Sequence, residues 1–212
     1  CGLQKTNLYL IAARPFMGKT AFALTIARHI ALLKKRPVVY FTPVLSEKKL
    51  LQLLLIAESD IELEKINRGQ LNISQSDRLK EITRQIGAAP FYIYSKPQLT
   101  VETTRKEILN NQDQYTPEVI VIDYLQLMGG GYNYSSSNKM NEEIVIELKN
   151  ITEEFNLTVI LLSQLTRHLE ERANRRPVLN DLLVYGDIVK AADLVICIYR
   201  DEYYNKDKTG ND

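Results

Sequence analysis

The sequence is poor in cysteine, in long apolar runs and in net charge, and each shortage excludes a class of protein. Two cysteines are too few for a disulfide framework, so we expect reduced thiols, with Cys197 in the core. No apolar run approaches the ~20 residues that cross a bilayer, and the N-terminus lacks the pattern of a signal peptide. Lysine plus arginine (27) nearly balance aspartate plus glutamate (26). This balance argues against nucleic-acid binding through bulk charge, though not against a local basic site.

The chain does have the length and composition of one globular domain, with 212 residues, 45% hydrophobic and 25% charged. Short apolar runs predict strands at 7–13, 37–42, 91–94, 119–123, 158–163 and 194–199. Between them, helical spacing predicts helices at 19–34, 46–58, 61–68, 74–86, 101–111 and 140–155. This alternation is typical of an α/β fold, a mostly parallel twisted sheet with helices on both faces. Ligands of such sheets collect at the carboxyl ends of the strands.

The first predicted strand ends in a P-loop whose usual first glycine is an alanine. In such a loop, backbone N–H groups and the positive end of the following helix surround a phosphate. Gly18 allows close approach of the backbone, Lys19 reaches the β- and γ-phosphates, and the Thr20 hydroxyl binds Mg²⁺. A chance GKT in a turn is the competing interpretation. The predicted nucleotide-binding residues are Ala13, Arg14, Pro15, Phe16, Met17, Gly18, Lys19 and Thr20.

Two later strands end in polar residues that suit the same site. Asp123 ends the run EVIVID and would hold Mg²⁺ through the water shell of the ion. Many strands end in an aspartate that has only a structural role. The P-loop earlier in the chain is what favours a metal-binding role for Asp123. Tyr124 follows instead of a glutamate, and a hydrolytic base must therefore come from another strand end. Gln164 leaves the strand at 158–163 and would sense the γ-phosphate, unless it merely caps backbone.

An arginine-rich segment, 166–180, follows Gln164 directly. Arg167, Arg172, Arg175 and Arg176 could contact phosphates of DNA or of a neighbouring subunit's nucleotide, and the alternative for each is a solvated surface arginine.

The strings ARPFMGKTAFAL, VIDYLQLM, LLSQLTRHLEERANRRPVLNDL and AADLVICIYRDE together resemble the RecA-like motor domain of DnaB-type replicative helicases. The resemblance covers almost the whole chain and implies a RecA-like P-loop NTPase fold. It also implies a ring-shaped homo-hexamer with ATP and Mg²⁺ between subunits, and single-stranded DNA passing 5′ to 3′ through the centre. Lys19, Thr20, Asp123 and Gln164 match the family's catalytic positions. Another RecA-type ATPase, such as a recombinase or a clock-type protein, fits the IDYLQL and SQLTRHLEER strings less well.

The same resemblance places DNA contacts at Arg167, Arg172 and Gly186, and possible partners in a primase and a helicase loader. It implies the cytoplasm of a bacterium or phage-infected cell, or a plastid stroma, and no membrane. We also expect residues 1–212 to be one domain cut from a longer protein. On that expectation the family's N-terminal domain, final strands and arginine finger lie outside the chain.

Several positions depart from the family's pattern. The glutamate that polarises water aligns with Val44, for which Glu47 is a possible substitute, and a phosphate-facing helix arginine aligns with Leu53. The DNA-contacting Arg-Glu-Ser-Gly turn aligns with 183–186, Leu-Val-Tyr-Gly, where only the glycine matches. Two interpretations therefore stay open. One is an active helicase motor, and the other is a catalytically weakened DnaB-like protein that binds ATP for a structural or regulatory role.

Overall fold

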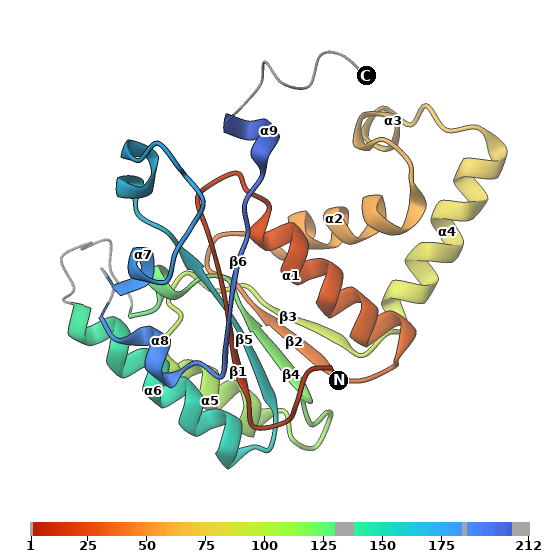
Figure 1. The fold of residues 1–212 in the computed structure, drawn as a ribbon. Coiled ribbons are helices and arrows are strands. Elements are labelled where there is room, and N and C mark those ends of the chain that lie inside the picture. Colours follow the sequence, from red (N-terminus) through yellow and green to blue (C-terminus); the bar gives the residue numbers. More distant parts are fainter. Residues whose placement is uncertain (1, 130–137, 184–185, 205–212) are drawn as a thin grey trace.

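The computed structural model describes residues 2–129, 138–183 and 186–204, which contain one six-stranded sheet (Figure 1). The strands lie in the order β3-β2-β4-β5-β1-β6, and every neighbouring pair is parallel. Their bounds are β1 Leu8–Ala13, β2 Val38–Phe41, β3 Phe91–Tyr94, β4 Val119–Ile122, β5 Thr158–Gln164 and β6 Leu194–Cys197. The predicted parallel sheet is confirmed.

Helices cover both faces of this sheet, as the composition of two buried clusters shows (Figure 1). One face is covered by α1 (Lys19–Arg28), η1 (His29–Leu33), α2 (Glu47–Ser59) and α4 (Ile73–Gly87). The other is covered by α5 (Val101–Asn110), α6 (Asn138–Glu154) and α8 (Ile188–Ala191). The remaining helical segments are α3 (Leu63–Arg68), η2 (Leu125–Leu127), η3 (Arg167–Glu171), α7 (Asn180–Leu183) and α9 (Asp201–Tyr204). None of the described helices is both long and apolar enough to span a membrane.

Strand side chains alternate between the two clusters because successive residues point to opposite faces. In β5, Val159 and Leu161 join one cluster while Ile160 and Leu162 join the other. The central strands are therefore apolar at nearly every position, which explains the unbroken apolar runs in the sequence.

Side-chain caps fix the starts of α2, α4 and α5. Ser46 accepts a hydrogen bond from the backbone N–H of Lys49 at the start of α2. Asn72 and Gln75 form a reciprocal capping box at the start of α4, and Thr100 and Thr103 do the same for α5.

The last strand differs from its prediction. β6 ends at Cys197, two residues early, and Leu194 is exposed. Cys197 is half-buried, although a core position was predicted, because β6 is an edge strand that is covered by β1 on one side only. The helix predicted to run to residue 34 is regular only to Arg28 and continues as the wider η1 turn.

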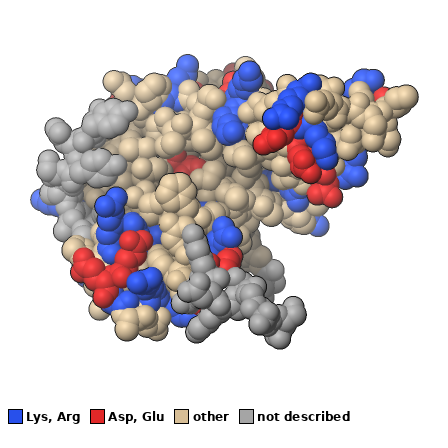
Figure 2. All heavy atoms as spheres, turned by 90° about the horizontal axis from the view of Figure 1, so that it is seen from above, with Lys and Arg blue, Asp and Glu red and all other residues tan. Residues whose placement is uncertain are grey.

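The strand order brings the ends of β4, β5 and β1 together. Ala13 lies opposite Gln164, and Ile122 lies opposite Leu161. Figure 2 looks down on this carboxyl-end face, where basic and acidic side chains are interspersed and no single sign prevails.

Candidate nucleotide-binding site

The P-loop joins the end of β1 to the start of α1. Gly18 caps α1 in a left-handed conformation with φ of +89°, and no side chain of the described residues caps the first turn of the helix. A Cβ at Gly18 would meet nothing within 4 Å, so the conformation, and not a lack of space, requires glycine there. Phe16 also has positive φ and projects into solvent, whereas Met17 is buried. The helix therefore offers open N–H donors, which is the condition for binding an anion.

Lys19 folds back across the loop, and its Nζ donates to the carbonyl of Ala13 at 3.2 Å. Burial lowers the pKa of Lys19, while the charge of Asp123 raises it and that of Arg14 lowers it. The ammonium group is thus held at the mouth of the loop by one weak neutral acceptor, which a phosphate oxygen can replace.

Asp123, Thr20 and Tyr40 form a hydrogen-bonded cluster beside the loop, in which Asp123 and Tyr40 are buried and Thr20 is half-buried. Asp123 is 3% exposed, and its Oδ2 accepts from Thr20 Oγ1 at 2.8 Å and from the Tyr40 hydroxyl at 3.0 Å. Burial raises the pKa of Asp123, and the two hydrogen bonds and the charge of Lys19 lower it. The pKa of Tyr40 lies well above its usual value because the hydroxyl is buried against this carboxylate. The sequence reasoning missed Tyr40, because in the sequence it is simply one residue of the predicted strand at 37–42.

This cluster fits a magnesium ion. A carboxylate and a hydroxyl oxygen are hard donors of the kind that Mg²⁺ prefers. No group of three His, Cys, Asp or Glu side chains that could hold a metal occurs among residues 2–129, 138–183 and 186–204. A metal held by Thr20 and Asp123 would take its other ligands from phosphate and water, as Mg²⁺ does in nucleotide sites.

Gln164 ends β5, and a second glutamine, Gln126 of η2, fixes its backbone. Gln126 Oε1 accepts from the Gln164 N–H at 3.0 Å, and Gln126 Nε2 donates to the Gln164 carbonyl at 3.3 Å and to Ser163 Oγ at 2.9 Å. The sequence reasoning missed Gln126, and its position three residues after Asp123 was the available signal.

Arg14 anchors the P-loop to the segment after β5. The side chain is 7% exposed, its Nε donates to Glu170 Oε1 at 2.8 Å, and its terminal nitrogen donates to the Leu165 carbonyl at 2.8 Å. The hydrogen bond from Arg14 lowers the pKa of Glu170. The side chain of Arg14 therefore braces the loop, while its backbone remains available to a nucleotide.

After β2 and within α2, apolar side chains stand at two positions where the resemblance implies charged ones. Val44 is 54% exposed, and its N–H donates to Thr42 Oγ1 at 3.2 Å. Glu47 is an exposed residue in the first turn of α2. Leu53, further along α2, lines a small cavity with Leu24 and Arg28 of α1.

The predicted DNA-contacting residues lie after β5. Arg167 is exposed at the start of η3. Arg172 pairs with Asp181 at 2.8 Å and donates to the Arg176 carbonyl at 3.1 Å, so it also ties the loop to α7. Gly186 has φ of +87° and donates its N–H to the Leu183 carbonyl at 3.1 Å. Leu183 is 46% exposed, and the predicted departures at positions 184 and 185 lie outside the described residues.

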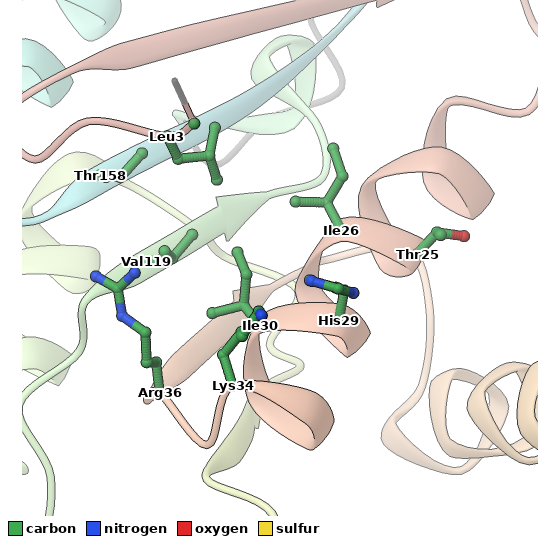
Figure 3. Close-up of a pocket in the computed structure, with 10 residues that line it drawn as sticks. Leu3, Thr25, Ile26, His29, Ile30, Lys34, Arg36, Val119 and Thr158 are labelled. Carbon is green, nitrogen blue, oxygen red and sulfur yellow. The ribbon is translucent and has the colours of Figure 1, made fainter.

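A separate cavity of about 580 Å³ lies at the other end of α1, away from the P-loop (Figure 3). Its lining includes His29 of η1 together with Val119 and Thr158, the first residues of β4 and β5. Arg36, which also lines it, is already paired with Glu118. Because this cavity faces the amino ends of the strands, it is not part of the predicted nucleotide site.

The chain matches the family model described as "DnaB-like helicase C terminal domain" over residues 1–212. A probable replicative DNA helicase of Trieres chinensis is 41% identical over 214 aligned positions, which cover 100% of this chain and 47% of the relative. The replicative DNA helicase DnaB of Geobacillus stearothermophilus is 36% identical and is covered to 46%, with 97% of this chain aligned. The chain thus spans about half the length of the curated relatives it matches.

Two solved structures share the fold. One is an ATPase domain with a TM-score of 0.87 and 31% identity, and the match covers 98% of this chain and 74% of that one. The other is a DnaB-like replicative helicase, solved in a study of its interactions with primase. It matches with a TM-score of 0.88 and 30% identity, over 97% of this chain and 50% of that one. The predicted RecA-like architecture is confirmed by these neighbours.

Proposed function

Because the chain belongs to the family of DnaB-like helicase C-terminal domains, we propose that it is the ATP-binding motor domain of a replicative DNA helicase. In this role it couples ATP hydrolysis to 5′-to-3′ unwinding of duplex DNA. The observation that carries the proposal is the 2.8 Å hydrogen bond between Thr20 and Asp123, residues 103 positions apart that meet beside the P-loop. A helix start with uncapped N–H groups, a lysine and a buried carboxylate together suit a nucleoside triphosphate and its metal.

Each residue has a definite task in this proposal. Backbone groups of 13–18 surround the phosphates, Lys19 exchanges its bond to the Ala13 carbonyl for a phosphate oxygen, and Thr20 and Asp123 hold Mg²⁺. When bound, Mg²⁺ supplies positive charge that stabilises the phosphates in the transition state. Gln164 faces the γ-phosphate, and Gln126 holds its backbone so that the side chain leaves β5 in a fixed direction.

Partners follow from the family and from the positions after β5. We propose that single-stranded DNA contacts Arg167, Arg172 and Gly186. The guanidinium group of Arg172, which is paired with Asp181, would also bind a DNA phosphate. The full-length protein would act as a homo-hexamer in the cytoplasm or a plastid stroma. The neighbour solved in a study of its interactions with primase supports a primase partner, and a helicase loader is proposed by analogy.

One observation favours a second candidate, a catalytically weakened member that binds ATP in a structural or regulatory role. The exposed side chain at position 44 is apolar, and an apolar group cannot orient an attacking water. Loss of such a base slows hydrolysis by ~10²–10⁴-fold while leaving nucleotide binding intact.

DNA-stimulated ATP turnover of the full-length protein separates the two candidates. The Geobacillus stearothermophilus relative, assayed in parallel, provides the reference rate. Turnover equal to that reference would exclude the weakened candidate, and turnover at least ~10²-fold lower with normal ATP binding would support it. Lys19→Ala should abolish nucleotide binding, and tight binding by this variant would refute both candidates.

Val44→Glu tests whether the missing glutamate causes any deficit in ATP turnover. If the rest of the site is intact, this substitution should raise turnover. An unchanged rate would show that another loss, such as the one at Leu53, limits the chemistry. Exposed Ile73→Glu, at the start of α4, serves as the control for adding a surface charge.

A further inference from the structure

The Tyr40 hydroxyl is a polar group on a face of β2 that is otherwise apolar. Tyr40 is fully buried, and its ring packs against Phe91 of β3 with the ring centres 6.3 Å apart. It belongs to the apolar cluster on the side of the sheet that α1 and α2 cover, together with Val121 and Leu162. A buried hydroxyl costs free energy unless it has a hydrogen-bond partner, so apolar packing alone would favour phenylalanine at this position.

The register of the sheet explains which partner the hydroxyl reaches. Tyr40 pairs with Val121 of β4, and side chains two residues apart along a strand point to the same face. The ladder continues to Asp123, whose N–H donates to the Phe41 carbonyl at 2.9 Å. Asp123 therefore lies on the same face as Tyr40, and Thr20 reaches that place from the start of α1, which covers this face.

Both side-chain hydrogen bonds to Asp123 meet at one carboxylate oxygen. Oδ2 accepts from Thr20 Oγ1 at 2.8 Å and from the Tyr40 hydroxyl at 3.0 Å. Each oxygen of a carboxylate has about two lone-pair sites, so these two donors fill Oδ2. Among the described residues, no hydrogen bond reaches Oδ1. The carboxylate is thus held by one oxygen, and the other oxygen keeps its lone pairs for a ligand.

We propose that Tyr40 is a positioning residue for the metal, which holds Asp123 by Oδ2 and leaves Oδ1 to the Mg²⁺ ion and its water shell. This inference rests on the proposed binding of a nucleotide with Mg²⁺, and it adds a residue that neither the P-loop nor the strand end contains. Thr20 cannot fix the carboxylate alone, because its hydroxyl is itself assigned to the metal. The bond from Tyr40 is the one that the ion does not share.

A fixed carboxylate also affects which metal is preferred. Mg²⁺ demands a near-ideal octahedral arrangement of its ligands, whereas Ca²⁺ accepts a flexible one. A carboxylate that can turn therefore costs Mg²⁺ more than Ca²⁺. The alternative is that the bond serves only the buried phenol, and in that case its loss would change the stability of the protein without changing the choice of metal.

The test measures dissociation constants of the full-length protein for a non-hydrolysable ATP analogue in excess Mg²⁺, in excess Ca²⁺ and in EDTA. The metal effect is the ratio of the constant in EDTA to the constant with the metal. Tyr40→Phe keeps the ring and removes the hydroxyl, and it should lower the Mg²⁺ effect roughly 10-fold, as is typical when a residue that orients a metal ligand is lost. The Ca²⁺ effect should fall less, and the constant in EDTA should change less than about twofold.

Tyr9→Phe is the matched control. Tyr9 is also a buried strand tyrosine, and its hydroxyl accepts from the Gln4 N–H at 2.9 Å, near the end of β1 that is opposite the P-loop. This variant loses a buried hydroxyl as well, and it should keep the metal effects of the wild type.

An unchanged Mg²⁺ effect in Tyr40→Phe would overturn the proposal, and so would equal falls of the Mg²⁺ and Ca²⁺ effects. A loss of affinity in EDTA as large as the loss in Mg²⁺ would also overturn it, and would assign Tyr40 to support of the P-loop. The same loss in Tyr9→Phe would show that the cause is a general weakening of the sheet. A wild-type protein whose affinity for the analogue did not depend on Mg²⁺ would refute the proposed metal site itself, independently of Tyr40.

Discussion

Replacing Gln126 by alanine should destabilise the protein by removing the three hydrogen bonds that hold the end of β5. The largest contribution comes from the Gln164 N–H, which loses its acceptor in a half-buried place, at a cost of ~1–3 kcal/mol. The two bonds from Nε2 are each worth ~0.5–1.5 kcal/mol, and water recovers part of that in the space left by the side chain. Together these give about 2 kcal/mol, or a decrease in Tm of about 4–8 °C for a domain of this size.

Thermal unfolding followed by circular dichroism measures this change, with Gln85→Ala as the control. Gln85 is an exposed helix residue that bonds only the neighbouring Glu81 carboxylate, at 2.9 Å, so its loss should cost less than about 0.5 kcal/mol. Equal Tm values for the two variants would refute the reasoning. Gln126→Ala also has a functional readout. If Gln164 contacts the γ-phosphate as proposed, its displacement should reduce the difference between the affinities for a non-hydrolysable ATP analogue and for ADP.

Three further outcomes follow from the geometry. Asp123→Asn should remove most of the Mg²⁺ dependence of ATP affinity in paired titrations with and without the metal, and an undiminished dependence would place the metal elsewhere. Arg14 depresses the pKa of Glu170, so their pair stabilises at neutral pH and its contribution is lost as pH falls through the folded pKa. The Tm advantage of wild type over Glu170→Gln should therefore vanish in acid, and a constant advantage across a pH series would contradict this. Gly69→Ala (φ +65°) should cost about 1 kcal/mol, whereas Gly87→Ala should stabilise by about 0.5 kcal/mol in urea unfolding. Equal effects would show that backbone conformation is not the cause.

The sequence predicts those parts of the fold that depend on short stretches of neighbouring residues. The strand at 119–123 is a run of apolar residues ended by aspartate, and the structure differs from it by one residue. The P-loop is likewise local, because a strand end, a glycine and a helix start fall within a few positions. Cys197 was misplaced because edge or centre position depends on strand order, which a local pattern does not contain.

Side-chain partners across the sheet could not be predicted for the same reason. Tyr40 meets Asp123 only because β2 and β4 are neighbours, and Arg14 meets Glu170 across 156 positions. Each of these contacts requires the strand order β2-β4-β5-β1 first. Gln126 could be predicted only in part. Its position shortly after Asp123 can be read from the sequence, but its hydrogen-bond partner Gln164 cannot.

Two of the positions that depart from the helicase pattern, Val44 and Leu183, are exposed, whereas Leu53 is half-buried and packs against the core. Val44 and Leu183 are 54% and 46% exposed, whereas Asp123 is 3% exposed and is bonded into the sheet edge. Substitution of an exposed side chain usually changes stability by less than about 0.5 kcal/mol, so the fold places no constraint on the first two positions. The fold therefore constrains Asp123, to which we assign the metal, more strongly than it constrains Val44 and Leu183, which align with hydrolytic and DNA-contacting positions of the family pattern. A rate assay on Val44→Glu thus tests chemistry alone, because that substitution leaves the sheet and the P-loop as they are.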